Sequence, residues 1–204
     1  MKTTHTKIAF ALLLLTACEE DDGNDEGAMA EETGEPGESE GSGSTTGGEM
    51  NFDELYACED PEPLVVQPLA GPGWDPETNA PVDPEIQNYV VSSTMIMVKP
   101  DQMGLFFELV GGVSEQIMAT DGFVAMSLAT DAECGWARTL TVWRDETAMY
   151  SFVVNGAHAQ AMQRTSEVAI TGKVTSWPAT ASELPPTWAT ARAKLAEIEP
   201  LADY

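Results

Sequence analysis

A single histidine follows the first eighteen residues, and it lies within TVWRDETAMYSFVVNGAHAQAM, residues 141–162. An imidazole titrates near neutral pH, so His158 is a candidate acid, base or ligand. The alternative is a histidine that packs in the core or caps a helix. Metal binding needs several ligands at fixed spacing, and the sequence has no CxxC or HExxH motif. We therefore predict no metal site and leave the role of His158 open.

Four further side chains are candidates for lining a substrate pocket: Arg138, Trp143, Phe152 and Trp177. A guanidinium on a strand either binds an anionic group of a substrate or forms a cross-strand ion pair. The three aromatic side chains either line a cavity or belong to the hydrophobic core. The residue types allow both alternatives.

The elements that must position these side chains begin at Tyr89. Residues 89–98, 122–129, 137–143 and 167–177 are rich in β-branched and aromatic types, which predicts four strands. Apolar residues recur at helical spacing from Met103 to Ile117, and a second helix is expected after the candidate N-cap Asp145. A last helix is expected over residues 184–198. The order β-α-β-β-α-β with a C-terminal helix predicts an α+β, ferredoxin-like fold.

In this fold the two helices cover one face of the sheet. The chain offers little to cover the other face except its short last helix. A sheet with one apolar face must bury that face, and pairing two sheets about a two-fold axis does so. We therefore expect a homodimer with the architecture of a dimeric α/β barrel.

The stretch TLTVWRDETAMYSFVVNGAHAQAM, with the strand ending at Trp177 and the following LPPTWATARAKL, resembles the antibiotic-biosynthesis monooxygenase-like domains. The resemblance covers residues 89–200 and implies the same dimeric α/β barrel. The superfamily includes cofactor-independent quinone-forming oxygenases and haem-degrading enzymes. Its haem-degrading branch has an Asn on the first strand and a Trp and a His on the second helix. Here Asn88 only begins the strand, and Phe152 and Met162 occupy the helix positions, so we predict no cofactor.

The N-terminus predicts export and lipid attachment. Residues 1–18, MKTTHTKIAFALLLLTAC, combine Lys2 and Lys7 with a short apolar run and a final cysteine. This order resembles a bacterial lipoprotein signal with its lipobox, in which Cys18 is acylated and becomes the first residue. Acyl chains such as palmitate would anchor the protein to the lipid bilayer of the cell envelope. Glu19, in place of Asp, favours the outer membrane if the organism is Gram-negative.

The acidic residues are concentrated in the front of the chain. The sequence has 34 Asp and Glu against 9 Lys and Arg, and no Lys or Arg falls between residues 19 and 88. This charge repels nucleic acid, so we exclude nucleic-acid binding. Residues 19–50 are acidic and rich in Gly and Ser, which predicts a disordered tether. Residues 51–88 are rich in proline and predict an extended segment before the domain of residues 89–204.

Two cysteines remain after Cys18, and an exported chain favours a disulfide between them. Cys58 lies where the acidic tail gains its first apolar residues, and Cys134 lies in the turn between the second and third strands. A bond between them would fix the proline-rich segment to the domain. The alternative is two free thiols.

Two functions therefore stay open. In the first, the domain is an oxygenase-like enzyme that binds or oxidises a small aromatic or quinone-like compound, and His158 assists proton transfer. In the second, it is a non-catalytic ligand-binding or interaction domain on a lipid anchor. An open apolar cavity reached by both His158 and Arg138 favours the first. A cavity filled by Met, Phe and Trp side chains favours the second.

Overall fold

In the computed structural model, the residues that can be described are 52–58, 64–131 and 133–199. All of them belong to one unit of the chain, residues 49–204. The predictions for the signal peptide, for acylation of Cys18 and for the tether over residues 19–50 lie outside the described residues. So do residue 51, at the start of the proline-rich segment, and residues 200–204, at the end of the expected domain.

From Asn88 onward the order of elements follows the predicted pattern of strands and helices, with short 3-10 turns before the first long helix and before the last helix. The elements are α1 (Phe52–Ala57), β1 (Leu64–Ala70), β2 (Trp74–Asp75), β3 (Ala80–Pro81), β4 (Asn88–Val98), η1 (Pro100–Gln102), α2 (Met103–Ala119), β5 (Phe123–Asp131), β6 (Trp136–Trp143), α3 (Glu146–Val153), α4 (Gly156–Gln163), α5 (Thr165–Val168), β7 (Ala169–Thr180), η2 (Ala181–Glu183) and α6 (Trp188–Ala196).

The main sheet is antiparallel and has five strands in the order β1-β5-β6-β4-β7. Strands β4, β5, β6 and β7 form the ferredoxin-like arrangement, because β4, the first of these four in the chain, lies between β6 and β7 in the sheet. The predicted α+β, ferredoxin-like fold is therefore confirmed. The helix predicted after Asp145 is also confirmed, since the Asp145 carboxylate accepts a hydrogen bond from the Ala148 amide at 2.8 Å.

Strand β4 defines two faces of the sheet, because neighbouring side chains along a strand point to opposite sides. Its odd-numbered residues from Tyr89 to Met97 are buried, and its even-numbered residues from Val90 to Val98 are half-buried. Val90 packs with Trp143 and Phe152, and Val91 packs with Ala191 of α6. We call the face that carries Val90 the inner face and the face that carries Val91 the outer face.

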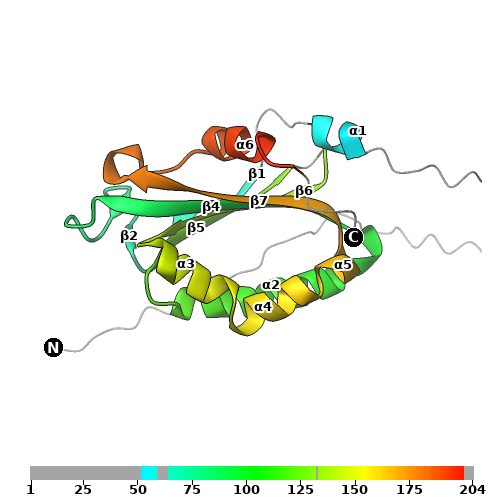
Figure 1. The fold of residues 1–204 in the computed structure, drawn as a ribbon, viewed down its shortest axis with the longest axis horizontal. Helices are drawn as coiled ribbons and strands as arrows, with labels where there is room; N and C mark the ends of the chain where they lie inside the picture. The colour runs from blue at the N-terminus through cyan, green and yellow to red at the C-terminus, as the bar shows by residue number, and fades with distance from the viewer. Residues whose placement is uncertain (1–51, 59–63, 132, 200–204) are drawn as a thin grey trace, which may run out of the picture. The chain divides into compact units, whose positions relative to one another are not determined.

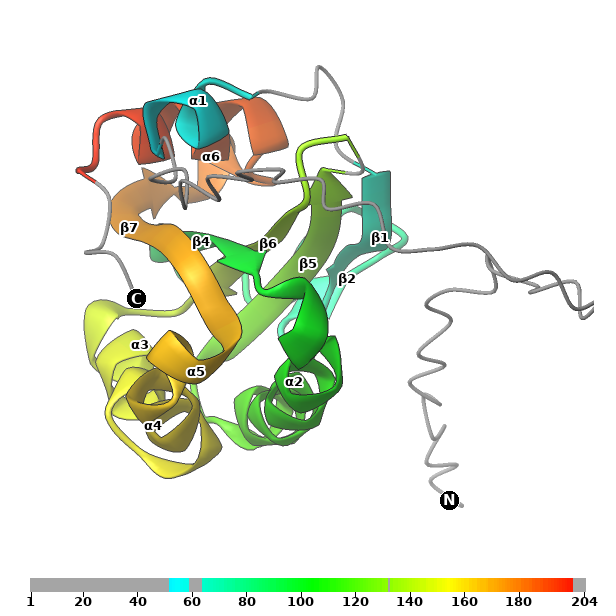
Figure 2. The same cartoon turned by 90° about the vertical axis from the view of Figure 1, so that its right-hand side faces the viewer.

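Helices cover both faces. Figures 1 and 2 show α2, α3, α4 and α5 on the inner side of the sheet and α1 with α6 on the outer side. Helix α6 buries Ala191 and Leu195 against the outer face. The premise of an uncovered sheet face is therefore wrong for the described residues. The homodimer that we inferred from this premise is not tested by a single chain.

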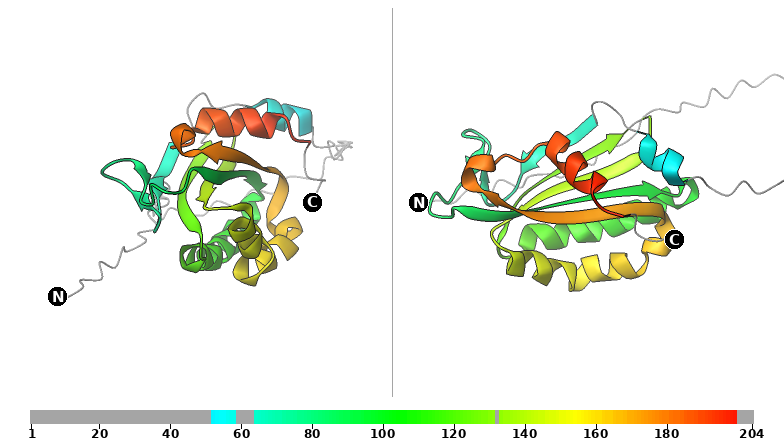
Figure 3. Two further views of the ribbon diagram at one scale, coloured as in Figure 1. Left: turned by 60° about the vertical axis from the view of Figure 1, so that its left-hand side comes forward. Right: turned by 45° about the horizontal axis from the view of Figure 1, so that its top comes forward.

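The folded region also begins earlier than the sequence suggested. Strand β1 pairs with β5, where Leu64 lies opposite Thr130, and so adds a fifth strand at the edge of the sheet. The β2–β3 hairpin follows it (Figure 3), and Trp74 at its start is buried against Tyr89 and Val124. The structure thus adds β1 and the β2–β3 hairpin to the elements expected within residues 89–204, and Trp74 docks on the sheet. The proline-rich segment is joined to the sheet by the pairing of β1 with β5 and by the burial of Trp74.

The predicted disulfide is confirmed. Cys58, directly after α1, is bonded to Cys134 in the β5–β6 turn across a sequence separation of 76. The bond places α1 over the β6 end of the outer face, where Tyr56 stacks on Trp136 with ring centroids 5.1 Å apart.

Candidate functional site

A row of four rings runs from the sheet to His158 on the inner side. Phe123 of β5 contacts Trp143 of β6 at 5.3 Å between ring centroids, and Trp143 contacts Phe152 of α3 at 5.1 Å. Phe152 in turn lies 4.5 Å from the imidazole of His158. Trp143 is almost fully buried, and its indole N–H donates to the Thr141 hydroxyl at 2.9 Å. The structure therefore brings together three residues that the sequence singled out: Trp143, Phe152 and His158.

Gln116 of α2 holds the turn between α3 and α4 that carries His158. Its side-chain carbonyl accepts a hydrogen bond from the His158 amide at 2.8 Å. Its side-chain amide donates to the carbonyl oxygens of Phe152 and Asn155 at 3.2 and 3.0 Å. One side chain thus satisfies backbone groups at the end of one helix and the start of the next. Sequence reasoning missed Gln116 because its partners are about forty residues away along the chain.

The ring of His158 has a defined tautomer. Its Nδ1 lies 3.1 Å from the carbonyl oxygen of Val153, which only accepts hydrogen bonds, so Nδ1 carries the proton. In the neutral ring Nε2 is then the basic nitrogen. Burial lowers the pKa of His158 below its usual value, and the bond to Val153 opposes this shift in part. His158 is therefore neutral at pH 7, with Nε2 as a hydrogen-bond acceptor.

The half of the inner face beyond the four rings is incompletely covered. Helix α4 buries none of its residues, and α2 buries only Ile117 despite its apolar sequence. Two rows of side chains on the sheet face these helices and, apart from a glycine, all keep contact with solvent. We call these rows the inner strip; across β5, β6, β4 and β7 they are Leu128, Thr139, Thr94 and Val174, and Thr130, Ala137, Ile96 and Gly172.

The inner strip is chemically uniform. All of its residues are uncharged, and most are small or β-branched. Val174 is 45% exposed although it faces the helical layer. The hydroxyl groups of the inner strip belong to three threonines, which lie among aliphatic side chains. Such a surface suits an uncharged and partly apolar molecule, because a charged molecule would lose its hydration without gaining a partner.

Arg138 does not belong to this site. It lies opposite Met95 in the register of β4 and β6, which places it on the outer face. Arg138 is 4% exposed and forms an ion pair with the fully buried Asp131, both Nε and Nη2 donating to the same Asp131 oxygen. The cross-strand ion pair is thus the alternative that the structure supports, in place of a contact to substrate.

Trp177 is also on the outer face. It pairs with Val91 across β4 and β7 and packs with α6 rather than with His158. The sequence-based pocket that joined Arg138 and Trp177 to Trp143 and Phe152 is therefore corrected. Neighbouring side chains along a strand point to opposite faces, so Arg138 and Trp177 lie on the outer face and Trp143 on the inner face. Which residues of different strands share a face depends on the register across the sheet.

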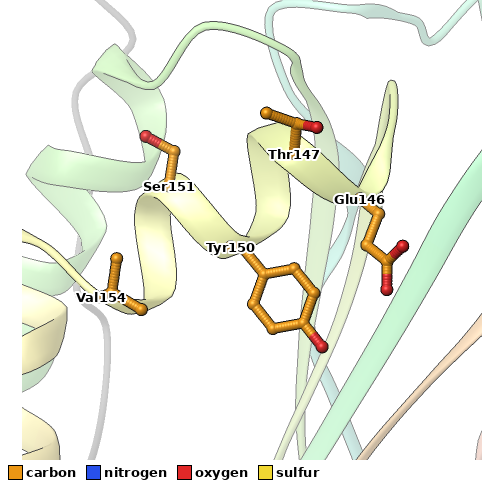
Figure 4. Close-up of a pocket in the computed structure, with 5 residues that line it drawn as sticks. All are labelled: Glu146, Thr147, Tyr150, Ser151 and Val154. Atoms are coloured by element: carbon orange, nitrogen blue, oxygen red, sulfur yellow. The ribbon is translucent and has the colours of Figure 1, made fainter.

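Two surface depressions lie on the helices rather than at His158. One of about 480 Å³ is lined by five residues of the α3 region: Glu146, Thr147, Tyr150, Ser151 and Val154. Figure 4 shows Thr147 and Ser151 on one side of the helix and Tyr150 on the other. The second, of about 350 Å³, lies between Val154 and Met162. Both are widely open to solvent and involve helices alone, so neither encloses a ligand.

Two searches of the described ranges bear on the remaining classes of site. They contain no group of three or more His, Cys, Asp or Glu side chains placed to hold a metal ion. No helix within residues 52–58, 64–131 and 133–199 is long and apolar enough to cross a membrane.

Comparison with known families and with curated proteins finds no match to this chain. Among solved structures, a candidate monooxygenase of Fusobacterium nucleatum is 14% identical over 58% of this chain, with a TM-score of 0.45. A candidate monooxygenase of Lactobacillus acidophilus is 18% identical over 47% of this chain, with a TM-score of 0.41. A candidate antibiotic-biosynthesis monooxygenase of Nitrosomonas europaea is 12% identical over 43% of this chain and 95% of its own length, with a TM-score of 0.40.

The matched region spans 49% of the Fusobacterium nucleatum protein and 48% of the Lactobacillus acidophilus protein. At these identities and scores the likeness concerns the fold alone and carries no conclusion about activity. The function must therefore be argued from the residues of this chain.

Proposed function

We propose that this chain is a membrane-tethered lipoprotein whose domain binds a small, uncharged and partly apolar compound on the inner strip. The observation that carries the proposal is the strip itself, whose uncharged side chains face a helical layer and still contact solvent. Ligand sites in proteins are largely apolar with a few placed polar groups, and here the threonine hydroxyls supply them, with His158 Nε2 as a further proposed acceptor. An aromatic or quinone-like compound fits this chemistry.

Binding without catalysis is the better supported of the two functions. The oxygenase hypothesis needed an open cavity reached by both His158 and Arg138, and Arg138 lies on the other face in an ion pair. The space around Trp143 is filled by a cluster that includes Phe123, Met126 and Phe152. Of the charged or titratable groups predicted for the pocket, His158 alone remains on the inner side.

Ligand binding can be tested with 1,4-naphthoquinone, a neutral aromatic quinone, by titration calorimetry on the mature chain with Cys18→Ser. The variant Ile96→Glu puts a charge into the inner strip and should abolish binding, because a carboxylate among these uncharged side chains disfavours an uncharged, partly apolar ligand. The matched control Val154→Glu puts the same charge into the open depression on α3 and should leave affinity unchanged. Equal binding by both variants, or no binding by the parent chain, contradicts the proposal.

Measurement of oxygen uptake distinguishes the oxygenase from a domain that only binds its ligand. Oxidation of a neutral hydroquinone to the quinone transfers two electrons and two protons to O₂, which an oxygen electrode records. We expect no uptake above the rate without protein, whereas His158→Ala should weaken quinone binding through loss of the Nε2 acceptor. Uptake that depends on the protein and is lost in His158→Ala would establish the oxygenase instead.

The lipid anchor is a separate part of the proposal and rests on residues 1–18. The order of positive charge, apolar run and cysteine supports cleavage before Cys18 and acylation of its thiol. The short apolar run supports the same reading, because it is too short to span a bilayer as a finished helix. Mass spectrometry of the N-terminal peptide from membranes should show an acylated Cys18 and no residue before it, and Cys18→Ser should release the protein from the membrane fraction. An unmodified Cys18 in an intact chain would rule the anchor out.

A further inference from the structure

The outer face of the sheet is closed by two segments of the chain itself. Helix α6 covers the part around Val91 and Leu140 through Ala191. Helix α1 covers the part around Trp136 and Met97 through Leu55 and Tyr56, and Leu195 of α6 adjoins it. Trp136, Asp131 and Thr171 on this face have no measurable exposure. Figure 1 shows α6 and α1 one after the other along the outer side of the sheet.

The two covers are held in different ways. Helix α6 has nine residues and an N-cap, since the Thr187 hydroxyl accepts from the Thr190 amide at 3.1 Å. Helix α1 has six residues, which is too short to be stable alone in water. The position of α1 on the outer face therefore depends on contacts that its residues make outside the helix.

Those contacts come mainly from Tyr56. Its ring stacks on Trp136, and its hydroxyl lies 2.7 Å from the Thr171 hydroxyl. The Lys173 ammonium lies over the same ring, 4.5 Å from its centroid. The remaining tie is covalent, because Cys58 directly after α1 is bonded to Cys134 beside Trp136. Tyr56 and the disulfide thus fix the cap to the same end of the sheet.

We propose that α1 is a disulfide-clamped cap that takes the place of a second protomer on the outer face, so that the oxidised chain is a monomer. An apolar sheet face must be covered by another layer, and a second copy of the same face is the usual symmetrical cover. Here that position is occupied by α1 and α6. The Asp131–Arg138 pair beneath the cap is internally neutral. The proposal replaces the homodimer that we expected from the sequence.

The test is sedimentation velocity of the full mature chain with Cys18→Ser, over a hundredfold range of concentration. The disulfide-bonded chain should sediment at the monomer mass throughout. The double variant Cys58→Ser/Cys134→Ser, which has no thiol left for intermolecular bonds, should form a dimer as concentration rises. Tyr56→Ala with the disulfide intact is the matched control and should stay monomeric, because the covalent tie keeps α1 in place.

A dimer of the disulfide-bonded chain overturns the proposal, and so does a folded double variant that remains monomeric. The route of pairing is checked by adding Val154→Glu, on the helical side, to the double variant. Dimers through the outer face should persist, whereas their loss would assign the contact to the helices and contradict the proposal. Hydrogen exchange of the peptide containing Trp136 gives an independent reading. Its protection should fall in the monomeric fraction of the double variant and stay unchanged in Tyr56→Ala.

Discussion

The imidazole of His158 contacts the ring of Phe152 in a tilted arrangement, while its Nδ1 donates to the carbonyl oxygen of Val153, which directly follows Phe152. Both contacts arise because α3 ends at Val153 and α4 begins only three residues later. The ring is thus held against the aromatic row by the helix that precedes it. This arrangement gives His158 one protonation state at neutral pH and one free basic nitrogen.

The first prediction is a loss of stability in mild acid. Burial lowers the pKa of His158 in the folded state, so the protonated ring is tolerated better in the unfolded chain. The free energy of unfolding should therefore be greatest above the unfolded pKa of about 6.5 and fall as pH drops from there to the folded pKa. Urea titrations at pH 7.5, 6.5 and 5.5 measure this slope. His158→Asn keeps a donor near Val153 but does not titrate, and an equal slope in this variant would assign the effect elsewhere.

The second prediction concerns the buried ion pair of the outer face. Arg138→Met leaves the Asp131 carboxylate buried without its partner and should lower the free energy of unfolding by about 3–5 kcal/mol. Asp131→Leu/Arg138→Met removes both charges and should recover most of that loss. Denaturant unfolding of the three proteins measures the difference. A double variant as unstable as the single one would mean that the pair itself, and not the uncompensated charge, is the source of stability.

The third prediction concerns the turn before His158. Gly156 has φ +58°, and a Cβ there would meet the Gln116 side-chain oxygen at 2.8 Å. Gly156→Ala should therefore cost about 1–2 kcal/mol for the backbone alone and should displace Gln116 from its bonds. Gly104→Ala in α2 is the control, because nothing lies within 4 Å of its Cβ position. That change should stabilise the chain by about 0.5–1 kcal/mol, and thermal unfolding distinguishes the two signs.

The fourth prediction is the boundary of the protease-resistant region. Because β1 pairs with β5 and Trp74 is buried, limited proteolysis should leave a fragment that begins before Leu64. Mass spectrometry of the non-reduced fragment should also find Cys58 attached through Cys134. A fragment that begins near Tyr89, with cuts between Ala70 and Asn88, would restore the shorter domain inferred from the sequence.

Much of the fold follows from local patterns. The β-branched and aromatic residues of 89–98 predicted strand β4, and the apolar spacing from Met103 to Ile117 predicted helix α2. Asp145 predicted the start of α3 through its capping side chain. These signals are local because a strand or helix presents its own periodicity to whatever it packs against. The cysteine count, together with the export signal, predicted the disulfide for a chemical reason rather than a geometric one.

The membership of the site was decided by the tertiary structure. Arg138 and Trp143 are on the same strand at odd spacing, so they point to opposite faces, and the register across β4 assigns one face to α6 and the other to α3. Gln116 and Asp131 gain their roles from partners on other elements, which leave no trace at short range in the sequence. The covering of the outer face by α1 and α6 likewise depends on contacts between segments that are far apart in the chain. The sequence by itself determined most of the strands and helices from Asn88 onward and favoured the pairing of the two cysteines, because those depend on neighbouring residues and on compartment. Which side chains share a face, and what covers it, depended on strand register and on packing between segments far apart in the chain.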